Sequence, residues 1–325
     1  MNKKQKSVME RVFGSIGGML FMVFLAHGCA DHRPSPGQTS VAADDDKRFG
    51  LLTLQLTQET TARNGTVAVN GGAVFVRSRG MDRAEVLKAV GTPDYSDFSE
   101  FEAGQCNLVI RPLADVPLRD DGTRDVELLE AGDVSIETPE NVVKLRSTYF
   151  PDLVPYISGV TYKVANSQRR PPAALRKQQK NTRIRATGSF DIPAFRADLD
   201  IDIPKTVTLV EVGGLSAAGG SVDTEPGRDL SVTWEPSGSP ATLFLVEINQ
   251  YSFDEVASIR CLVPDTGIFT IPEETLSSLP MWGSATKRLQ VNRISIQPFD
   301  ADGLDDGVFV LVAQDSVVLR DTSVP

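Results

Sequence analysis

The chain has 325 residues, with 33 Lys and Arg, 43 Asp and Glu and two His, which gives a net charge of −10 at pH 7. This acidic balance disfavours general nucleic-acid binding, because contacts with the phosphate backbone need positive charge. The two histidines, His27 and His32, precede the predicted folded body, so a histidine-based catalytic triad or zinc site is excluded there.

Residues 1–28 are typical of a signal peptide. A basic start precedes an apolar stretch from Val12 to Ala26 that is too short to span a bilayer, which needs about 20 apolar residues. Residues 25–29, Leu-Ala-His-Gly-Cys, then resemble the lipobox of bacterial lipoproteins. The resemblance implies cleavage before Cys29, lipidation of Cys29 and, because Ala30 follows, sorting to the outer membrane. The alternative is an ordinary secretory signal cleaved near Gly28.

Residues 29–48 are polar and contain Pro34, Pro36 and a run of three aspartates, which predicts a flexible tether. Without residues 1–28 the chain keeps 29 Lys and Arg against 42 Asp and Glu, a net charge of −13. The residues that follow the tether are numerous enough for two ordinary domains with their own hydrophobic cores.

Short alternating runs separated by Gly, Pro, Asn and Asp predict strands from residue 49 onward. In the first predicted domain, residues 49–204, they cover 51–56, 66–69, 73–77, 106–110, 126–129 and 133–137. Residues 82–90 have the spacing of an amphipathic helical turn, and Asp121-Gly122 favours a hairpin turn.

The second predicted domain, residues 205–325, has a tighter rhythm of strands. They cover 206–212, 229–234, 242–248, 257–263, 267–271, 288–297 and 308–314. Residues 230–234 and 242–246, with Trp234 expected in the core, resemble a fibronectin type III or immunoglobulin-like sandwich, which implies architecture and not function. The predicted fold is therefore all-β, with two antiparallel β-sandwich domains.

Residues 259–272, followed by Leu279-Pro280, are similar to a segment repeated in uncharacterised lipoproteins of myxobacteria and related groups, as are residues 104–106 and 188–195. The resemblance implies two strands joined by the turn at residues 265–267, and then a helical turn that begins at Pro272. It implies no activity. Glu273 and Glu274, at the start of this turn, suit the positive end of the helix dipole better than an acid pair for glycoside hydrolysis.

Cys106 and Cys261 fall in different predicted domains, so we expect two buried unpaired thiols. A disulfide is the alternative, since an oxidising compartment favours one, but it requires the two Cα atoms to lie within about 7 Å.

The segment from Asp300 to Gly307 places Asp300, Asp302, Asp305 and Asp306 close together around a glycine turn. Its start resembles Asp-x-Asp-Gly calcium loops, although the loop lacks the glutamate expected at the twelfth position. A solvated hairpin tip explains the same residues. No cofactor other than this calcium is indicated.

Residues 163–185 carry eight basic side chains and no acid, which predicts an exposed loop that binds anions such as lipid headgroups or a polyanion. A solvated insertion is the alternative. The candidate anion-binding residues are Arg169, Arg170, Arg176, Lys177, Lys180, Arg183 and Arg185.

Together these features predict a non-catalytic envelope lipoprotein that is held on a membrane by its lipid and presents loops to a protein or polysaccharide partner. The alternative is a carbohydrate-binding or carbohydrate-active protein on the same scaffold. That alternative requires exposed aromatic side chains, for which the candidates are Tyr156, Tyr162, Tyr251 and Trp282.

Overall fold

The computed structural model describes residues 46–58, 67–89, 103–112, 126–138, 141–150, 159–164, 168–170, 182–201, 204–237, 243–252, 255–280 and 286–321. All of them belong to the compact unit Ala43–Pro325. The predicted signal peptide, Cys29 and most of the predicted tether lie outside the described residues. Within the ranges given above, no helix is long and apolar enough to cross a membrane.

Strands make up most of the described chain, which confirms the predicted all-β class. Those before residue 204 are β1 (Asp46–Gln58), β2 (Val67–Arg79), β3 (Cys106–Pro112), β4 (Val126–Leu128), β5 (Val134–Thr138), β6 (Asn141–Phe150), β7 (Gly159–Val164), β8 (Gln168–Arg170), β9 (Thr182–Ala186) and β10 (Phe195–Leu199). Those after it are β11 (Leu209–Val212), β12 (Leu215–Ser216), β13 (Ser221–Thr224), β14 (Leu230–Trp234), β15 (Leu243–Tyr251), β16 (Glu255–Val263), β17 (Ile268–Ile271), β18 (Lys287–Phe299) and β19 (Asp306–Asp321). The helical elements are α1 (Arg83–Ala89), the 3-10 turn η2 (Ala217–Gly219) and α2 (Glu273–Leu276).

Alternating burial explains why the short runs form strands. In β10, Phe195, Ala197 and Leu199 are buried, whereas Arg196 and Asp198 are exposed, so that one face of the strand meets the core. Strand β15, which lies between β18 and β16, is instead buried on both faces over most of its length. The predicted helical turn at residues 82–90 is confirmed as α1.

The two predicted strands at 66–69 and 73–77 are one strand, β2, which continues through Gly71 and Gly72. A Cβ atom at Gly71 would lie 2.6 Å from the backbone oxygen of Thr53, and one at Gly72 would lie 2.6 Å from that of Tyr162. These glycines therefore allow β1 and β7 to approach β2 closely, and they do not form a turn.

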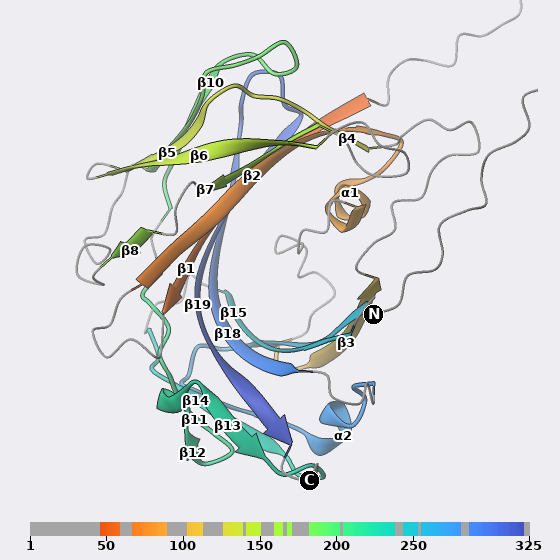
Figure 1. Ribbon diagram of the computed structural model, residues 1–325, viewed down its shortest axis with the longest axis vertical. Coiled ribbons are helices and arrows are strands. Elements are labelled where there is room, and N and C mark those ends of the chain that lie inside the picture. Colours follow the sequence, from red (N-terminus) through yellow and green to blue (C-terminus); the bar gives the residue numbers. More distant parts are fainter. Residues whose placement is uncertain are drawn as a thin grey trace, which may run out of the picture. The chain divides into compact units, whose positions relative to one another are not determined.

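The larger sheet has the order β10-β9-β5-β6-β7-β2-β1-β19-β18-β15-β16-β3, and Figure 1 shows how β19, β18 and β15 curve along it. Most neighbours are antiparallel, but β19 runs parallel to both β1 and β13. Strands from both sides of residue 204 thus share one sheet. The predicted boundary between domains 49–204 and 205–325 therefore does not coincide with a boundary between sheets. Local patterns along the chain could not reveal this, because they carry no information about pairing between distant strands.

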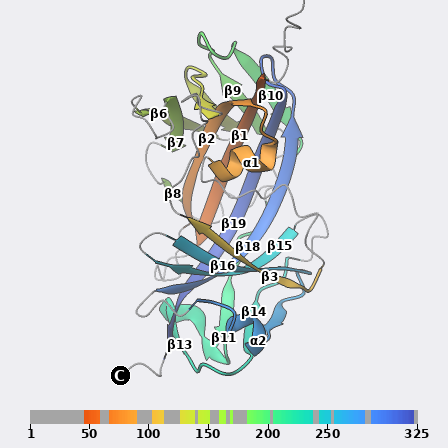
Figure 2. The same ribbon diagram turned by 90° about the vertical axis from the view of Figure 1, so that its right-hand side faces the viewer.

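The second sheet, β12-β11-β14-β17, completes the sandwich. In Figure 2 its strands β11 and β14 lie at the opposite end of the larger sheet from β9 and β10. Trp234 on β14 is 3 % exposed and stacks on Phe244 of β15 at a ring-centroid distance of 4.4 Å. The expectation that Trp234 lies in the core is confirmed.

A buried ion pair joins β18 of the larger sheet to the loop between β16 and β17. The guanidinium of Arg293 on β18 donates to both carboxylate oxygens of Asp265, at 2.9 and 3.2 Å, and its side chain is 1 % exposed. The carboxylate of Asp265 also accepts from the indole N–H of Trp234 at 2.8 Å and the hydroxyl of Ser237 at 2.6 Å. Burial alone would raise the pKa of Asp265, but the hydrogen bonds from Arg293, Ser237 and Trp234 lower it to about 2.

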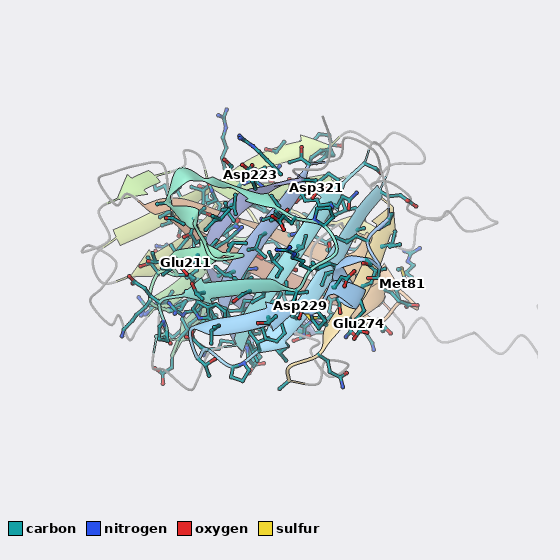
Figure 3. The ribbon with its side chains drawn as sticks, turned by 90° about the horizontal axis from the view of Figure 1, so that it is seen from below. Met81, Glu211, Asp223, Asp229, Glu274 and Asp321 are labelled. Atoms are coloured by element: carbon teal, nitrogen blue, oxygen red, sulfur yellow. A yellow bond between two sulfur atoms is a disulfide. The ribbon has the colours of Figure 1, made fainter. Side chains whose placement is uncertain are left out.

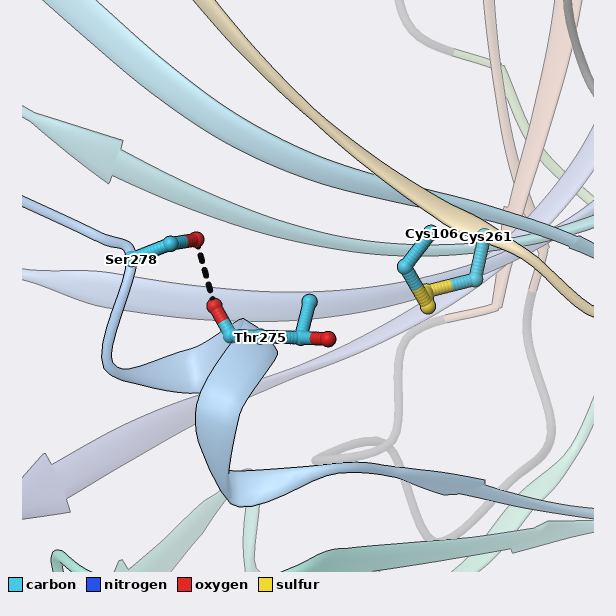
Figure 4. The surroundings of a disulfide bond; sticks show 4 residues. All are labelled: Cys106, Cys261, Thr275 and Ser278. Atoms are coloured by element: carbon cyan, nitrogen blue, oxygen red, sulfur yellow. Dashed lines mark hydrogen bonds between the residues drawn. A yellow bond between two sulfur atoms is a disulfide. The ribbon is translucent and has the colours of Figure 1, made fainter.

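A disulfide joins Cys106 to Cys261, so the expectation of two unpaired thiols is wrong. The edge strand β3 pairs with β16 in a register that places the two cysteines directly opposite each other, with Cα atoms 4.1 Å apart. Figure 4 shows the bridge beside α2, where the hydroxyl of Ser278 donates to the backbone oxygen of Thr275 at 2.6 Å. The bridge ties the outermost strand of the larger sheet to its neighbour.

Candidate functional site

Three segments meet at one end of the larger sheet, which we call the turn end. They are the start of β1, the loop between β9 and β10 (residues 187–194), and the turn between β18 and β19 (residues 300–305). Figures 1 and 2 both place β9, β10 and the β18–β19 turn at the same end. The turn end therefore gathers residues that are far apart in the sequence.

The β18–β19 turn is fixed to the start of β1. The carboxylate of Asp305 accepts the backbone N–H of Arg48 at 2.6 Å, and the N–H of Asp305 donates to the backbone oxygen of Arg48 at 2.9 Å. Gly303 has a φ of +82° and lies so close to the other loop that a Cβ atom would be 2.4 Å from the Cδ of Pro193. Only glycine fits this position without displacing the loop.

The β9–β10 loop is held by its own hydrogen bonds and by its neighbours. The N–H of Ser189 donates to the oxygen of Ile192 at 2.8 Å, and the N–H of Gly188 donates to that of Ala131 at 3.0 Å. The carboxylate of Asp191 accepts the N–H of Glu130 at 3.1 Å. The loop is thus a fixed part of the turn end.

Two open hollows lie at the turn end, on either side of Leu304. The first has a volume of about 590 Å³. Its charged lining residues are Arg185, Arg196, Asp300 and Asp302. The second has a volume of about 650 Å³ and is lined by Asp46, Arg48, Arg77, Gly303, Leu304 and Asp305. The described residues of both linings carry both signs of charge, which suits a polar ligand that also carries both charges.

The four aspartates of the predicted calcium loop do not converge. Asp300 and Asp302 face the first hollow, Asp305 holds the N–H of Arg48, and Asp306 forms an ion pair with Arg83 at 2.9 Å. Within the described part of the chain, no group of three or more Asp, Glu, His or Cys side chains could hold a metal ion. The loop therefore lacks the shared centre that calcium needs.

Of the predicted anion-binding residues, the structure describes the side chains of Arg183 and Arg185. The side chains of Arg169 and Arg170, on β8, and all of Arg176, Lys177 and Lys180 lie outside the described residues. Arg183 forms an ion pair with Asp198 at 2.6 Å, whereas Arg185 lines the first hollow. Arg196 also lines this hollow and was missed by the sequence analysis; the alternating pattern of β10 was the signal that it points away from the core.

The aromatic candidates for a sugar site give little support to it. Tyr162 is buried, and its hydroxyl accepts the N–H of Ala131 at 2.7 Å. Tyr251 is 45 % exposed, and Tyr156 and Trp282 lie outside the described residues. Among the described residues that line the two hollows, Phe195 is the one aromatic residue, and it is 6 % exposed, so these residues offer no platform on which a sugar ring could stack.

A second polar cluster, on β15, β16 and β18, is buried. The carboxylate of Glu247 accepts the amide N–H of Asn292 at 3.0 Å, and Asn249 accepts the hydroxyl of Ser258 at 2.6 Å. Each of these four residues is less than a tenth exposed. Because the cluster is closed to solvent, the turn end is the better candidate for binding.

Comparison with known proteins adds little. No protein-family model matches the chain, and no curated protein matches it. A search of solved structures finds a similarity to the yeast delta-COP-I mu-homology domain, at 10% sequence identity and a TM-score of 0.22, over 86% of this chain and 100% of that one. A TM-score this low does not establish a shared fold, so a function must be argued from the chain's own residues.

Proposed function

We propose that the protein is an exported bacterial lipoprotein, anchored to the outer membrane through Cys29, that acts as a non-catalytic interaction module in the cell envelope. The observation that carries the proposal is the disulfide between Cys106 and Cys261. Disulfides persist in oxidising compartments and are rare in the cytosol. The bridge therefore supports export independently of the signal-peptide and lipobox patterns in residues 1–29.

The two hollows at the turn end are the proposed contact site. Their arginines and aspartates lie on β1, β2, β9, β10 and the β18–β19 turn, and both hollows open to solvent. Charges of both signs at a fixed spacing favour specificity for one partner over others, because a mismatched partner meets like charge. We expect the partner to be a protein or a polysaccharide that carries both charges.

The chemistry of the same residues supports the proposed non-catalytic role. The chain has no histidine after His32, and both of its cysteines after Cys29 are joined in the disulfide. The aspartate with a clearly shifted pKa, Asp265, is fully engaged in its buried ion pair with Arg293. The hollows thus present charges that can bind a partner but none of the usual activated nucleophiles.

The anchor is tested by intact mass and membrane fractionation of the wild type and of Cys29→Ala in a lipoprotein-processing bacterium. We expect acyl mass on a chain that begins at Cys29, and its loss together with release from the membrane in the variant. Thiol labelling of the unfolded chain should detect Cys106 and Cys261 only after reduction. An unmodified, soluble wild type would overturn the lipoprotein proposal.

The contact site is tested in cells with a photo-crosslinking residue at Thr187, which lines the first hollow. The control places the same residue at Asp223, an exposed position on β13. Adducts at position 187 that are absent at position 223 are expected. Equal labelling at both positions, or none at either, would contradict the proposed site.

A further inference from the structure

The side chain of Phe190 is fully exposed, at 104 % of its reference area, at the tip of the β9–β10 loop. The other large hydrophobic side chains that are exposed in the described chain range from 39 % to 69 %. An isolated exposed apolar residue needs no explanation by itself. The case for Phe190 rests on where the loop lies and on how firmly it is held.

Hydrogen bonds fix both sides of Phe190. The hydroxyl of Ser189 donates to the backbone oxygen of Glu130, and the N–H of Asp191 donates to the hydroxyl of Ser189 at 3.0 Å. The guanidinium of Arg48 donates to the backbone oxygen of Asp191 at 3.1 Å. Because the backbone on both sides of Phe190 is already held, little backbone conformational entropy is lost when its side chain enters an apolar environment.

The contact with Arg48 places Phe190 beside the start of β1. Strand β1 begins at Asp46, 17 positions after the proposed lipid anchor at Cys29. A chain of that length reaches at most about 60 Å. The 13 residues of β1 then run roughly 40 Å away from the turn end. The chain that leads from the anchor therefore joins the described body at the turn end.

Acidic side chains lie at both ends of the larger sheet, so charge does not distinguish the two ends. Around Phe190, the acids Glu130, Asp133, Asp191 and Asp305 outnumber the nearby basic side chain of Arg48, while Arg185 and Arg196 lie in the adjoining hollow. At the opposite end, Figure 3 shows acidic side chains at Glu211, Asp223, Asp229 and Glu274. The described acids around Phe190 therefore favour a zwitterionic lipid surface over an anionic one.

We propose that Phe190 docks the tethered body on the lipid surface that holds its anchor, by inserting its ring into the interface of a zwitterionic bilayer. This inference rests on the proposed lipid anchor. Burying one phenylalanine changes a partition constant by about tenfold to a hundredfold, which is too little to bind a free chain to a membrane. The anchor supplies the high effective concentration at which this contact orients the body.

The test uses the full lipidated protein in phosphatidylcholine vesicles with brominated acyl chains, which quench tryptophan fluorescence. Phe190→Trp should add emission that these lipids quench by at least half relative to unbrominated vesicles. The matched control is Tyr251→Trp, since Tyr251 is exposed and follows Gln250, which pairs with Lys287 at the far end of β18. Its added emission should stay unquenched.

The outcomes separate this inference from the proposed function. An acylated chain whose tryptophan at position 190 is quenched no more than the control would overturn the docking inference and leave the anchor intact. A chain without acyl mass would overturn the proposed anchor and the docking together. Anionic phosphatidylglycerol vesicles should reduce the quenching, because acids surround Phe190; stronger quenching there would contradict the zwitterionic interface.

Discussion

Two groups of arginine and aspartate side chains in this protein differ in burial and in the role that we assign to them. Arg293 and Asp265 are 1 % and 6 % exposed and are bound to each other and to the backbone and side chains around them. Arg185, Arg196, Asp300 and Asp302 line an open hollow instead, where Arg196 forms a long ion pair of 3.9 Å with Asp198. The buried group stabilises the fold, whereas the side chains in the hollow contact solvent and can bind a partner in place of water.

The largest effect should come from removing one partner of the buried pair. Arg293→Met leaves the carboxylate of Asp265 buried without its cation, which costs about 3–5 kcal/mol in the free energy of unfolding. Urea unfolding measures this loss, with Arg185→Met as the matched control, for which we expect a change within about 0.5 kcal/mol. Equal losses in the two variants would remove the distinction between the two groups.

The buried pair should also make the free energy of unfolding depend on pH in acid. The pKa of Asp265 is lowered from 3.8 to about 2 in the folded chain, so its ionised form stabilises the fold above about pH 4. This contribution, about 2 kcal/mol, is lost as the pH falls from about 4 to 2. The difference in free energy of unfolding between the wild type and Asp265→Asn should therefore shrink across this window. A difference independent of pH would contradict the assignment.

The smallest effect on stability is expected in the hollow. Arg185→Ala and Arg196→Ala together should change the free energy of unfolding by less than about 1 kcal/mol, because both side chains are exposed. The same double variant should lose the photo-crosslinked adducts at Thr187. A variant that is unstable, or that keeps its adducts, would show that these arginines support the fold and not the contact.

Local patterns in the sequence predict the strands well. The alternation in residues 230–234 places Val232 and Trp234 in the core, where both are buried, and the Asp265-Thr266-Gly267 turn lies between β16 and β17 as expected. The helical turn that begins after Pro272 is confirmed as α2, with Glu273 and Glu274 in its first turn. Each of these features depends on neighbours within a few residues.

Pairings between distant residues were not predictable in the same way. The Cys106–Cys261 bridge depends on the register of β3 against β16, which are 155 residues apart at the bridge. The first hollow combines Arg185 with Asp300 and Asp302, which the sequence analysis assigned to two unrelated sites, one for anions and one for calcium. Only the pairing of strands shows that these residues share one end of the sheet.

The parallel pairing of β1 with β19 has a consequence for the order of events during synthesis. Asp305 and Arg48, which are joined by hydrogen bonds, are 257 residues apart, so β1 can pair with β2 early but lacks its second partner, β19, until almost the whole chain is available. Contacts of such high sequence separation slow folding. If the chain crosses a membrane in an extended form, its body stays unfolded until the C-terminal strand emerges, and it needs protection from aggregation throughout that interval.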